Sequence, residues 1–311
     1  MRVLVTGANG FAGRHLVARL SERGHVVVTA GRPLEGAADY ALDLADLDNL
    51  RSVVAGAQPD AIVHLAAQAF VPAANADALG TYDVNALGTA RLLEAVRAHA
   101  PAARVVVAGS ADVYGVQPAA AFPLRETAAP NPANPYAASK VAAEAFAVAA
   151  ARTYGLDIVV TRAFNHIGPG QDPRFVVASF ARQLAAIAAG GEPHLWVGNL
   201  EAQRDFLDVR DVVSAYALLA ERAGGERGAI FNIARGEALA IKEILRRLIT
   251  IAHVPVEVRE DPARMRPADV PLVLGDPAKL REATGWAPQI PLERSLRDIY
   301  ADARERVAAA R

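Results

Sequence analysis

The sequence predicts an α/β fold, in which a doubly wound parallel sheet is followed by a smaller C-terminal lobe. In the first half of the chain, short runs rich in β-branched residues alternate with longer helical patterns. These runs are apolar throughout, as expected for parallel strands that helices cover on both faces. A glycine-rich turn follows the first run, and the regular alternation stops near residue 165. We therefore expect a sheet unit over residues 1–165 and a smaller lobe over 166–311, from which the chain crosses back to the sheet.

The elements of the sheet unit follow one another in a βα order. Helical patterns cover residues 11–23, 81–99 and 135–154. Each lies between apolar runs, so successive strands are joined by crossovers, as a doubly wound sheet requires. The runs are "RVLVTG", "HVVVTA", "AIVHLAA", "RVVVAGS" and "LDIVVTRAFN".

The second half is richer in turns. Segments such as "HIGPGQDPR" and "GGEPHLWVGN" break it into pieces, which argues for a lobe built around short connections. No linker-like stretch separates the halves, so we expect them to share one core. Helical patterns in this half lie near residues 175–189, 211–221, 241–252 and 291–309.

Composition narrows the class of protein. The 311 residues are 52% hydrophobic and 22% charged, which is typical of a folded globular chain. A formal charge of −1 gives no electrostatic reason to expect nucleic acid or an anionic membrane as a partner. The absence of cysteine excludes disulfides, thiolate metal sites and cysteine nucleophiles, and we expect no bound metal. No secretory signal or membrane span is recognisable, so we expect a cytoplasmic protein.

The segment "VTGANGFAG" places three glycines where the first strand meets the first helix. Gly7, Gly10 and Gly13 have the spacing G-x-x-G-x-x-G. Small residues let the backbone approach a pyrophosphate, and the helix N-terminus offers unpaired N–H groups and a partial positive charge. Because the motif heads a βαβ pattern, it predicts a Rossmann dinucleotide site rather than a turn that only packs helix on strand.

The end of the second strand bears on which nicotinamide cofactor binds. An acidic residue there would bond the ribose hydroxyls of NAD, whereas an arginine accommodates the phosphate of NADP. The sequence has Gly31 and Arg32 at this point, which favours NADP(H) and leaves NAD(H) possible. Farther along, Asp43 is placed to meet the adenine amino group, and the small side chains of "HLAA" are suited to line the cofactor.

A tyrosine and a lysine in "NPYAASK" form the candidate catalytic pair. Tyr136 and Lys140 are four residues apart at the start of a helical pattern and share one helix face. A nearby ammonium favours the phenolate, so we expect Lys140 to lower the pKa of Tyr136 from its usual ~10. The phenol could then exchange a proton with a carbonyl or hydroxyl oxygen while hydride moves to or from nicotinamide.

Together with Ser110 at the end of "RVVVAGS", these motifs resemble the extended short-chain dehydrogenase/reductases, in the branch that acts on nucleotide-diphosphate sugars. The resemblance runs from Met1 to the C-terminal helix. It implies that Ser110 holds the sugar oxygen, Tyr136 is the acid/base and Lys140 binds the nicotinamide ribose. Tyr114 of "VYG" is assigned to packing. The cofactor residues predicted from motif and resemblance are Gly7, Asn9, Gly10, Phe11, Ala12, Gly13, Arg32, Asp43, Leu44, Leu65, Ala66, Ala67, Tyr136, Lys140 and His166.

The second half is most similar to reductases that act on carbon 4 of GDP-4-keto-6-deoxy-D-mannose and yield GDP-D-rhamnose. The segments that carry this similarity are "FNHIGPGQ", "FVVASFARQ", "QRDFLDVRDVVSAY" and "RPADVPLVLGDPAKL". Two arginines from distant segments suit a diphosphate. The substrate residues implied in this way are Ser110, Asp112, Asn165, Val177, Arg204, Arg266 and Asp269.

Several related activities remain as alternatives. The 4,6-dehydratases resemble Thr-Asp-Glu or Thr-Ser-Glu where this chain has Ser110-Ala111-Asp112, so the shorter carboxylate disfavours dehydration. Fucose-forming enzymes use a cysteine, which is absent, and a histidine. His166 could therefore be read as an acid, although a substrate-loop or structural role is favoured. A 4-epimerase of the same family is another alternative, and such an enzyme would retain NAD. A sister reductase would give the talose product instead of the rhamnose product. A non-catalytic NADP sensor is a further alternative, but it would not need the proton donor Tyr136.

The long helical patterns over residues 81–99 and 135–154 resemble the dimerisation helices of this family. Their alanine-rich faces indicate close packing against something. The resemblance implies a homodimer held by a four-helix bundle.

Overall fold

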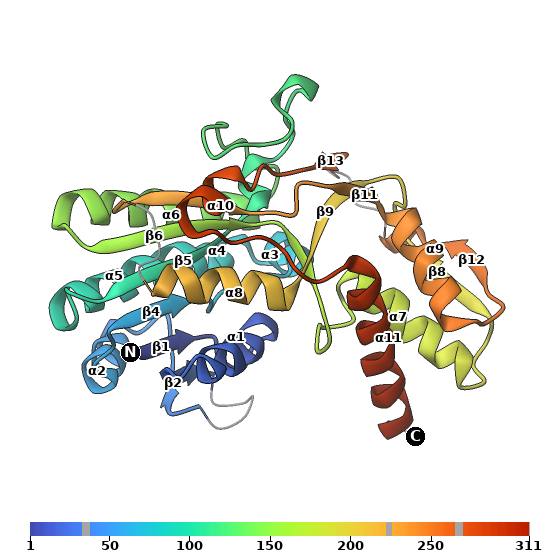
Figure 1. Ribbon diagram of the computed structural model, residues 1–311, viewed down its shortest axis with the longest axis horizontal. Helices are drawn as coiled ribbons and strands as arrows, with labels where there is room; N and C mark the ends of the chain where they lie inside the picture. Colours follow the sequence, from blue (N-terminus) through green and yellow to red (C-terminus); the bar gives the residue numbers. More distant parts are fainter. Residues whose placement is uncertain (33–37, 222–225, 265–269, 311) are drawn as a thin grey trace.

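Seven parallel strands form the main sheet, in the order β3-β2-β1-β4-β5-β6-β10 (Figure 1). The computed structural model describes residues 1–32, 38–221, 226–264 and 270–310. The chain starts at the centre of the sheet, runs to one edge and then crosses to the other half, so that the order reverses between β1 and β4. In such sheets the ligand crevice lies at this reversal, beyond the carboxyl ends of the strands. The strands are β1 (Arg2–Thr6), β2 (Val26–Gly31), β3 (Tyr40–Ala41), β4 (Ala61–His64), β5 (Arg104–Ser110), β6 (Asp157–Ala163) and β10 (Ala229–Ile233).

Helices cover both faces of this sheet. In β1, Val3 and Val5 join the core under one face, whereas Leu4 joins the core under the other. This alternation explains why consecutive apolar residues follow one another along the strands. One face carries α2 (Leu47–Ala57), α5 (Gly88–His99) and α6 (Pro135–Tyr154), and the other carries α1 (Phe11–Glu22) and α8 (Val209–Ala220).

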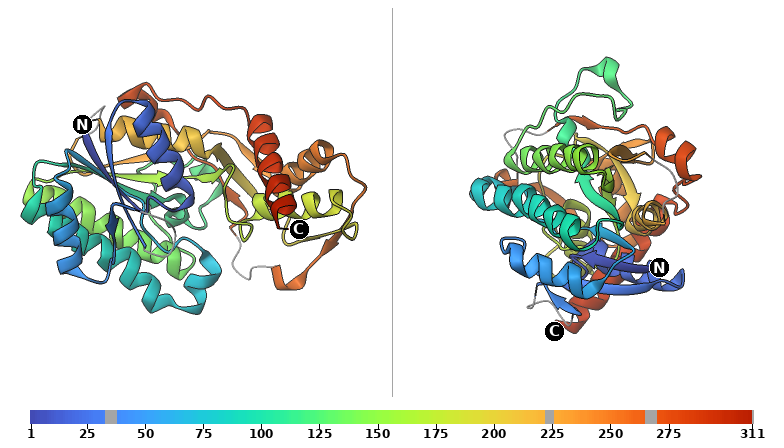
Figure 2. Two further views of the ribbon diagram at one scale, coloured as in Figure 1. Left: turned by 90° about the horizontal axis from the view of Figure 1, so that it is seen from below. Right: turned by 90° about the vertical axis from the view of Figure 1, so that its left-hand side faces the viewer.

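The C-terminal lobe stands to one side of the sheet (Figures 1 and 2). A third apolar core joins its helices and strands. The chain returns from the lobe to the main sheet through α8 and β10 and then enters the lobe again. The lobe elements are β7 (Asn165–Ile167), α7 (Val176–Ala188), β8 (His194–Val197), β9 (Gln203–Asp208), β11 (Ala238–Ala240), α9 (Ile241–Ala252), β12 (Glu257–Glu260), β13 (Leu272–Val273) and α11 (Leu292–Ala309), with α10 (Ala278–Thr284) beside β10.

The predicted fold class is confirmed, with one informative difference. The helical pattern over residues 81–99 is not one regular helix. It consists of the end of α4 (Ala78–Tyr82), a π-helix at Asp83–Leu87, and then α5, and α3 (Val71–Ala76) precedes it. Such π-turns are uncommon and often mark functional positions. Within the described ranges, no helix is both long and apolar enough to cross a bilayer.

Candidate active site

The glycine turn brings three backbone segments together at the reversal point of the sheet. Gly7 has φ +72°, and a Cβ there would lie 2.8 Å from the amide nitrogen of Ala66, just after β4. A Cβ on Gly13 would lie 2.1 Å from the carbonyl oxygen of Gly7. Both positions therefore require glycine. The N-cap of α1, Gly10, makes no side-chain capping bond, so the first-turn N–H groups can meet an anion such as a pyrophosphate.

The adenosine end of the predicted cofactor site lies beyond β2. Arg32 is exposed directly after the strand, and Asn9 lies beside Gly31, whose Cβ would be 3.1 Å from the Asn9 amide nitrogen. Asp43 is also exposed, and its carboxylate accepts from the backbone of Ala45 at 2.9 Å. The side chain of Leu44 instead belongs to the core under α5, so only its backbone can face a ligand.

Ser110 and Tyr136 meet at the carboxyl end of β5. Ser110 ends the strand, and its hydroxyl accepts from the backbone N–H of Asp112 at 3.2 Å. Tyr136 lies in the first turn of α6, where Asn134 caps the helix by accepting from Ala137 at 2.9 Å. The Ser110 side chain acts on the Tyr136 phenol as a hydrogen-bonding neighbour, and its effect is to lower the pKa of the phenol. Residues from two distant segments thus place a hydroxyl pair where a carbonyl oxygen could bind.

The pKa of Tyr136 is raised, contrary to the prediction from the Tyr-x-x-x-Lys spacing. Burial is the main cause, and the negative charge of Asp112 adds to it, whereas the bond from Ser110 acts in the opposite direction. Lys140 makes its hydrogen bond elsewhere, donating to the carbonyl of Ala108 on β5 at 2.9 Å. Burial also lowers the pKa of Lys140 to about 8. The phenol is therefore neutral and suited to donate a proton.

Asn85, on the π-helix, is a further residue at this site that the sequence analysis did not single out. Its amide donates to the Ser139 hydroxyl at 3.0 Å and to the Gln68 carbonyl at 2.9 Å, and its oxygen accepts from the Gln68 backbone at 2.8 Å. Ser139 in turn donates to the carbonyl of Tyr136 at 2.7 Å. In the sequence, the only sign of this residue's role was a polar asparagine within the helical pattern "DVNALGT".

His166 lies against the glycine turn rather than in a proton-donating position. Its ring stacks on Phe11 with 6.0 Å between centroids and a 4° interplanar angle. Its Nδ1 donates to the carbonyl of Phe164 at 3.0 Å, and burial lowers its pKa. The neighbouring Asn165 is exposed on β7.

The predicted substrate residues of the lobe differ in accessibility. Arg204 on β9 is partly exposed and donates to the carbonyl of Gln203 at 2.8 Å. Val177 is only 1% exposed and packs in the core of the lobe, so its side chain is not available to a ligand and only its backbone could take part. Arg266 and Asp269 lie outside the described residues.

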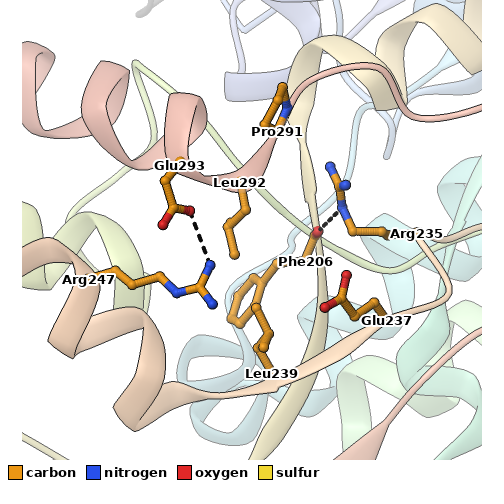
Figure 3. Close-up of a pocket in the computed structure, with 8 residues that line it drawn as sticks. All are labelled: Phe206, Arg235, Glu237, Leu239, Arg247, Pro291, Leu292 and Glu293. Atoms are coloured by element: carbon orange, nitrogen blue, oxygen red, sulfur yellow. Dashed lines mark hydrogen bonds and ion pairs between the residues drawn. The ribbon is translucent and has the colours of Figure 1, made fainter.

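A separate cavity of about 230 Å³ lies within the lobe (Figure 3). Its walls combine the Arg247–Glu293 ion pair with Arg235, which donates to the carbonyl of Phe206. None of the predicted site residues lines it. The lining residues are Phe206, Arg235, Glu237, Leu239, Arg247, Pro291, Leu292 and Glu293.

Comparison with known proteins agrees with this geometry. The profile of the family described as GDP-mannose 4,6-dehydratase matches residues 4–299. The chain is 42% identical to GDP-6-deoxy-D-mannose reductase of Pseudomonas aeruginosa over 98% of both chains.

Solved structures agree as well. The structure of Pseudomonas aeruginosa RMD in complex with NADPH is similar with a TM-score of 0.87 at 40% identity, covering 98% of this chain and 100% of that one. Thermus thermophilus UDP-glucose 4-epimerase with NAD has the same TM-score of 0.87 at 32% identity, covering 98% and 99%. With its glycine turn and its Ser110, Tyr136 and Lys140, the chain therefore belongs to the GDP-mannose 4,6-dehydratase family of extended short-chain dehydrogenase/reductases.

Proposed function

We propose that this protein is a nucleotide-sugar 4-ketoreductase, which uses NADPH to reduce GDP-4-keto-6-deoxy-D-mannose to GDP-D-rhamnose. The 42% identity to a GDP-6-deoxy-D-mannose reductase over 98% of both chains supports the substrate class. The observation that carries the reaction type is the buried Tyr136 phenol in the first turn of α6, near Ser110 at the end of β5, because burial raises the pKa of the phenol and favours its protonated form. Reduction of a ketone consumes a proton, and a protonated phenol can supply it.

The residues divide the chemistry between them. When bound, the nicotinamide supplies the hydride that goes to carbon 4. Tyr136 donates its proton to the keto oxygen, which becomes a hydroxyl. Ser110 holds that oxygen and stabilises the charge that develops on it. Lys140 donates to the carbonyl oxygen of Ala108 at 2.9 Å, and its positive charge would favour the phenolate that remains after proton transfer.

The cofactor assignment rests on the end of β2. An exposed Arg32 and the absence of a carboxylate at Gly31 and Arg32 suit the extra phosphate of NADP(H). The similar structure from Pseudomonas aeruginosa contains NADPH, and others in the family contain NAD, so NAD(H) use is also consistent. Asn9, Asp43 and the backbone of residues 65–67 would surround the adenosine and the pyrophosphate.

The substrate would lie between the sheet and the lobe. Its keto sugar would meet Ser110 and Tyr136, and Asn165 and Arg204 would hold the phosphate side. An arginine is suited to a diphosphate because its guanidinium donates in a fixed fork. Arg266 and Asp269 complete the proposed set, and Val177 would contribute its backbone.

Reduction is a better proposal than dehydration at this site. Dehydratases of the family have a glutamate where this chain has Asp112, and the missing methylene withdraws the carboxylate by about 1.5 Å. A misplacement of ~1 Å can cost on the order of 100-fold in rate. Asp112 acts here instead by raising the pKa of Tyr136. The rhamnose product is proposed from the relative's name, and the talose epimer is the alternative.

We also propose that the enzyme is a cytoplasmic homodimer joined by a four-helix bundle. The helical surface before and at the π-helix exposes large apolar side chains: Leu79 is 86% exposed, Tyr82 44% and Leu87 44%. On α6 the exposed positions include Ala138, Ala145 and Ala149, which allow close helix approach. A monomeric mass by light scattering at micromolar concentration would contradict the dimer.

The direct test mixes purified protein with NADPH and GDP-4-keto-6-deoxymannose. We expect stoichiometric loss of NADPH absorbance, and a slower loss when NADH replaces NADPH. Unchanged absorbance with a keto sugar shown to be intact would contradict the proposal.

A further inference from the structure

His64 is a buried histidine that the proposed reaction does not use. It ends β4, is 3% exposed, and lies between the glycine turn and the π-helix. Its Nδ1 is 2.7 Å from the Thr6 hydroxyl, and its Nε2 is 3.1 Å from the Thr89 hydroxyl. Both ring nitrogens therefore have partners inside the protein.

The hydrogen bonds around Thr89 determine which nitrogen of His64 carries the proton. The Thr89 hydroxyl donates to the carbonyl of Asn85 at 2.6 Å, so its single proton is already used. Its oxygen must then accept from the Nε2–H of His64. Nδ1 is left as an acceptor, and Thr6 donates to it. Burial and the charge of Lys140 lower the pKa of His64 to about 3, which keeps the ring neutral.

This oriented set of bonds joins the two halves of the active site. At one end, Thr6 directly precedes Gly7, and its hydroxyl oxygen accepts from the Ala66 amide at 3.4 Å. At the other end, Asn85 bonds Ser139, which bonds the carbonyl of Tyr136. His64 is hydrogen-bonded to Thr89, and Thr89 is hydrogen-bonded to the carbonyl of Asn85 on the π-helix. The Asn85 side chain is in turn hydrogen-bonded to Ser139 on α6.

We propose that His64 and Thr89 are positioning residues for the reduction, which keep the Tyr136 phenol in register with the cofactor turn through Asn85. This inference rests on the proposed function. Neither residue needs to touch substrate or cofactor. Their effect is on geometry, and a misplacement of ~1 Å at the reacting atoms can cost on the order of 100-fold in rate.

The test compares three threonine variants by kcat, by the KM values for NADPH and keto sugar, and by the melting temperature. Thr89→Val keeps the shape of the side chain but removes its hydroxyl, whereas Thr89→Ser keeps the hydroxyl and removes the methyl group. Thr284→Val is the matched control, because Thr284 also donates to the carbonyl four residues earlier, Leu280, at 2.7 Å and accepts one N–H, from Trp286 at 3.1 Å. Thr284 ends α10, whereas Tyr136 is on α6, so the two residues are far apart in sequence.

We expect Thr89→Val to lower kcat about tenfold while both KM values stay within about twofold of the wild type, as for an interaction realised in the transition state. Thr89→Ser should recover most of kcat, and Thr284→Val should lower only the melting temperature. If Thr89→Val retained the kcat of Thr284→Val, or if Thr89→Ser gave no recovery, the inference would be overturned. An inactive wild type would instead contradict the proposed function.

A second measurement on the unmutated protein does not depend on whether the variants fold. Nitrogen-15 NMR of histidine-labelled protein distinguishes the two neutral tautomers from the imidazolium. We expect His64 to be the neutral Nε2–H tautomer at neutral pH. A protonated ring, or the Nδ1–H tautomer, would contradict the orientation of the bonds and with it the positioning role.

Discussion

Lys140 follows Tyr136 by one helical turn on α6, yet its ammonium donates to the carbonyl of Ala108 on β5, 2.9 Å away. The lysine is buried, and a single carbonyl compensates little of the cost of burying its charge. The neighbouring phenol keeps a raised pKa because burial and Asp112 outweigh the bond from Ser110. The site thus holds a protonated acid and, one helical turn away, a cation that is costly to bury.

Removing the phenol hydroxyl should remove the proton donor. We expect Tyr136→Phe to lower kcat by at least ~100-fold, the usual contribution of a positioned general acid. Binding of NADPH, measured by fluorescence titration, should change little, because the ring still packs at the start of α6. A variant that retained a tenth or more of the wild-type kcat would show that another group supplies the proton.

Removing the negative charge at residue 112 should shift the pH profile. Asp112 raises the pKa of Tyr136, so Asp112→Asn should lower it, and the protonated phenol should be lost at a lower pH. We therefore expect the alkaline limb of kcat/KM to move to lower pH, with a modest loss of rate near neutrality. An unmoved or alkaline-shifted limb would contradict the electrostatic role assigned to Asp112.

Replacing the buried lysine should raise the stability of the folded protein and abolish its activity. Burial lowers the pKa of Lys140 to about 8, below its value in an unfolded chain, so the folded protein is penalised while the lysine is charged. Lys140→Met should therefore raise the free energy of unfolding at neutral pH, by about 1–3 kcal/mol, and abolish activity. The wild type regains stability as the pH rises from the folded value of about 8 toward ~10.4, so the difference should shrink there.

The control for this experiment is Lys242→Met. Lys242 is exposed and paired with Glu201 at 2.7 Å, so its loss should give no gain in stability. Chemical denaturation of the three proteins at neutral and alkaline pH would make the comparison. If Lys140→Met unfolded at lower denaturant than the wild type near neutrality, burial of the charge would not be the dominant effect.

Reversing the charge after β2 should change the cofactor preference. An aspartate next to the phosphate of NADPH introduces like-charge repulsion, which is costly. We expect Arg32→Asp to raise the KM for NADPH relative to that for NADH by at least about tenfold. Arg304→Asp, which changes an exposed arginine on α11, should leave the ratio unchanged. An equal ratio in the two variants would remove Arg32 from the cofactor site.

Truncating the arginine of β9 should weaken sugar-nucleotide binding. A hydrogen bond to a charged group contributes about 1.5–3 kcal/mol, so Arg204→Ala should raise the KM for the GDP sugar by roughly tenfold or more. The KM for NADPH should stay unchanged. Arg246→Ala is the comparison, because that exposed arginine on α9 pairs with Glu243 of the same helix at 2.7 Å. Equal effects in the two variants would contradict the role of Arg204.

The fold and the cofactor turn could be predicted because they depend on local patterns. Apolar runs spaced by helices determine a parallel sheet, and glycine is required at residues 7 and 13 of the turn that follows the first strand. The π-helix at Asp83–Leu87 could not be predicted, because it depends on the partners of Asn85. Those partners, Gln68 and Ser139, lie 17 and 54 residues away in sequence.

The candidate site shows the same limit. The spacing of Tyr136 and Lys140 correctly places both on α6, but it does not determine the pKa of the phenol. That pKa depends on burial and on Asp112, which the fold supplies from another element. Val177 was predicted as a substrate residue, but its side chain is buried because α7 packs its first turn into the core of the lobe.

In the proposed reaction, hydride is delivered to carbon 4 of the keto sugar and Tyr136 donates the accompanying proton. NMR of the product formed with NADPH that carries deuterium at the transferred position tests it most directly. We predict GDP-D-rhamnose with deuterium at carbon 4, and no such product from Tyr136→Phe. Recovery of unreduced keto sugar, or of a product without deuterium at carbon 4, would contradict the account.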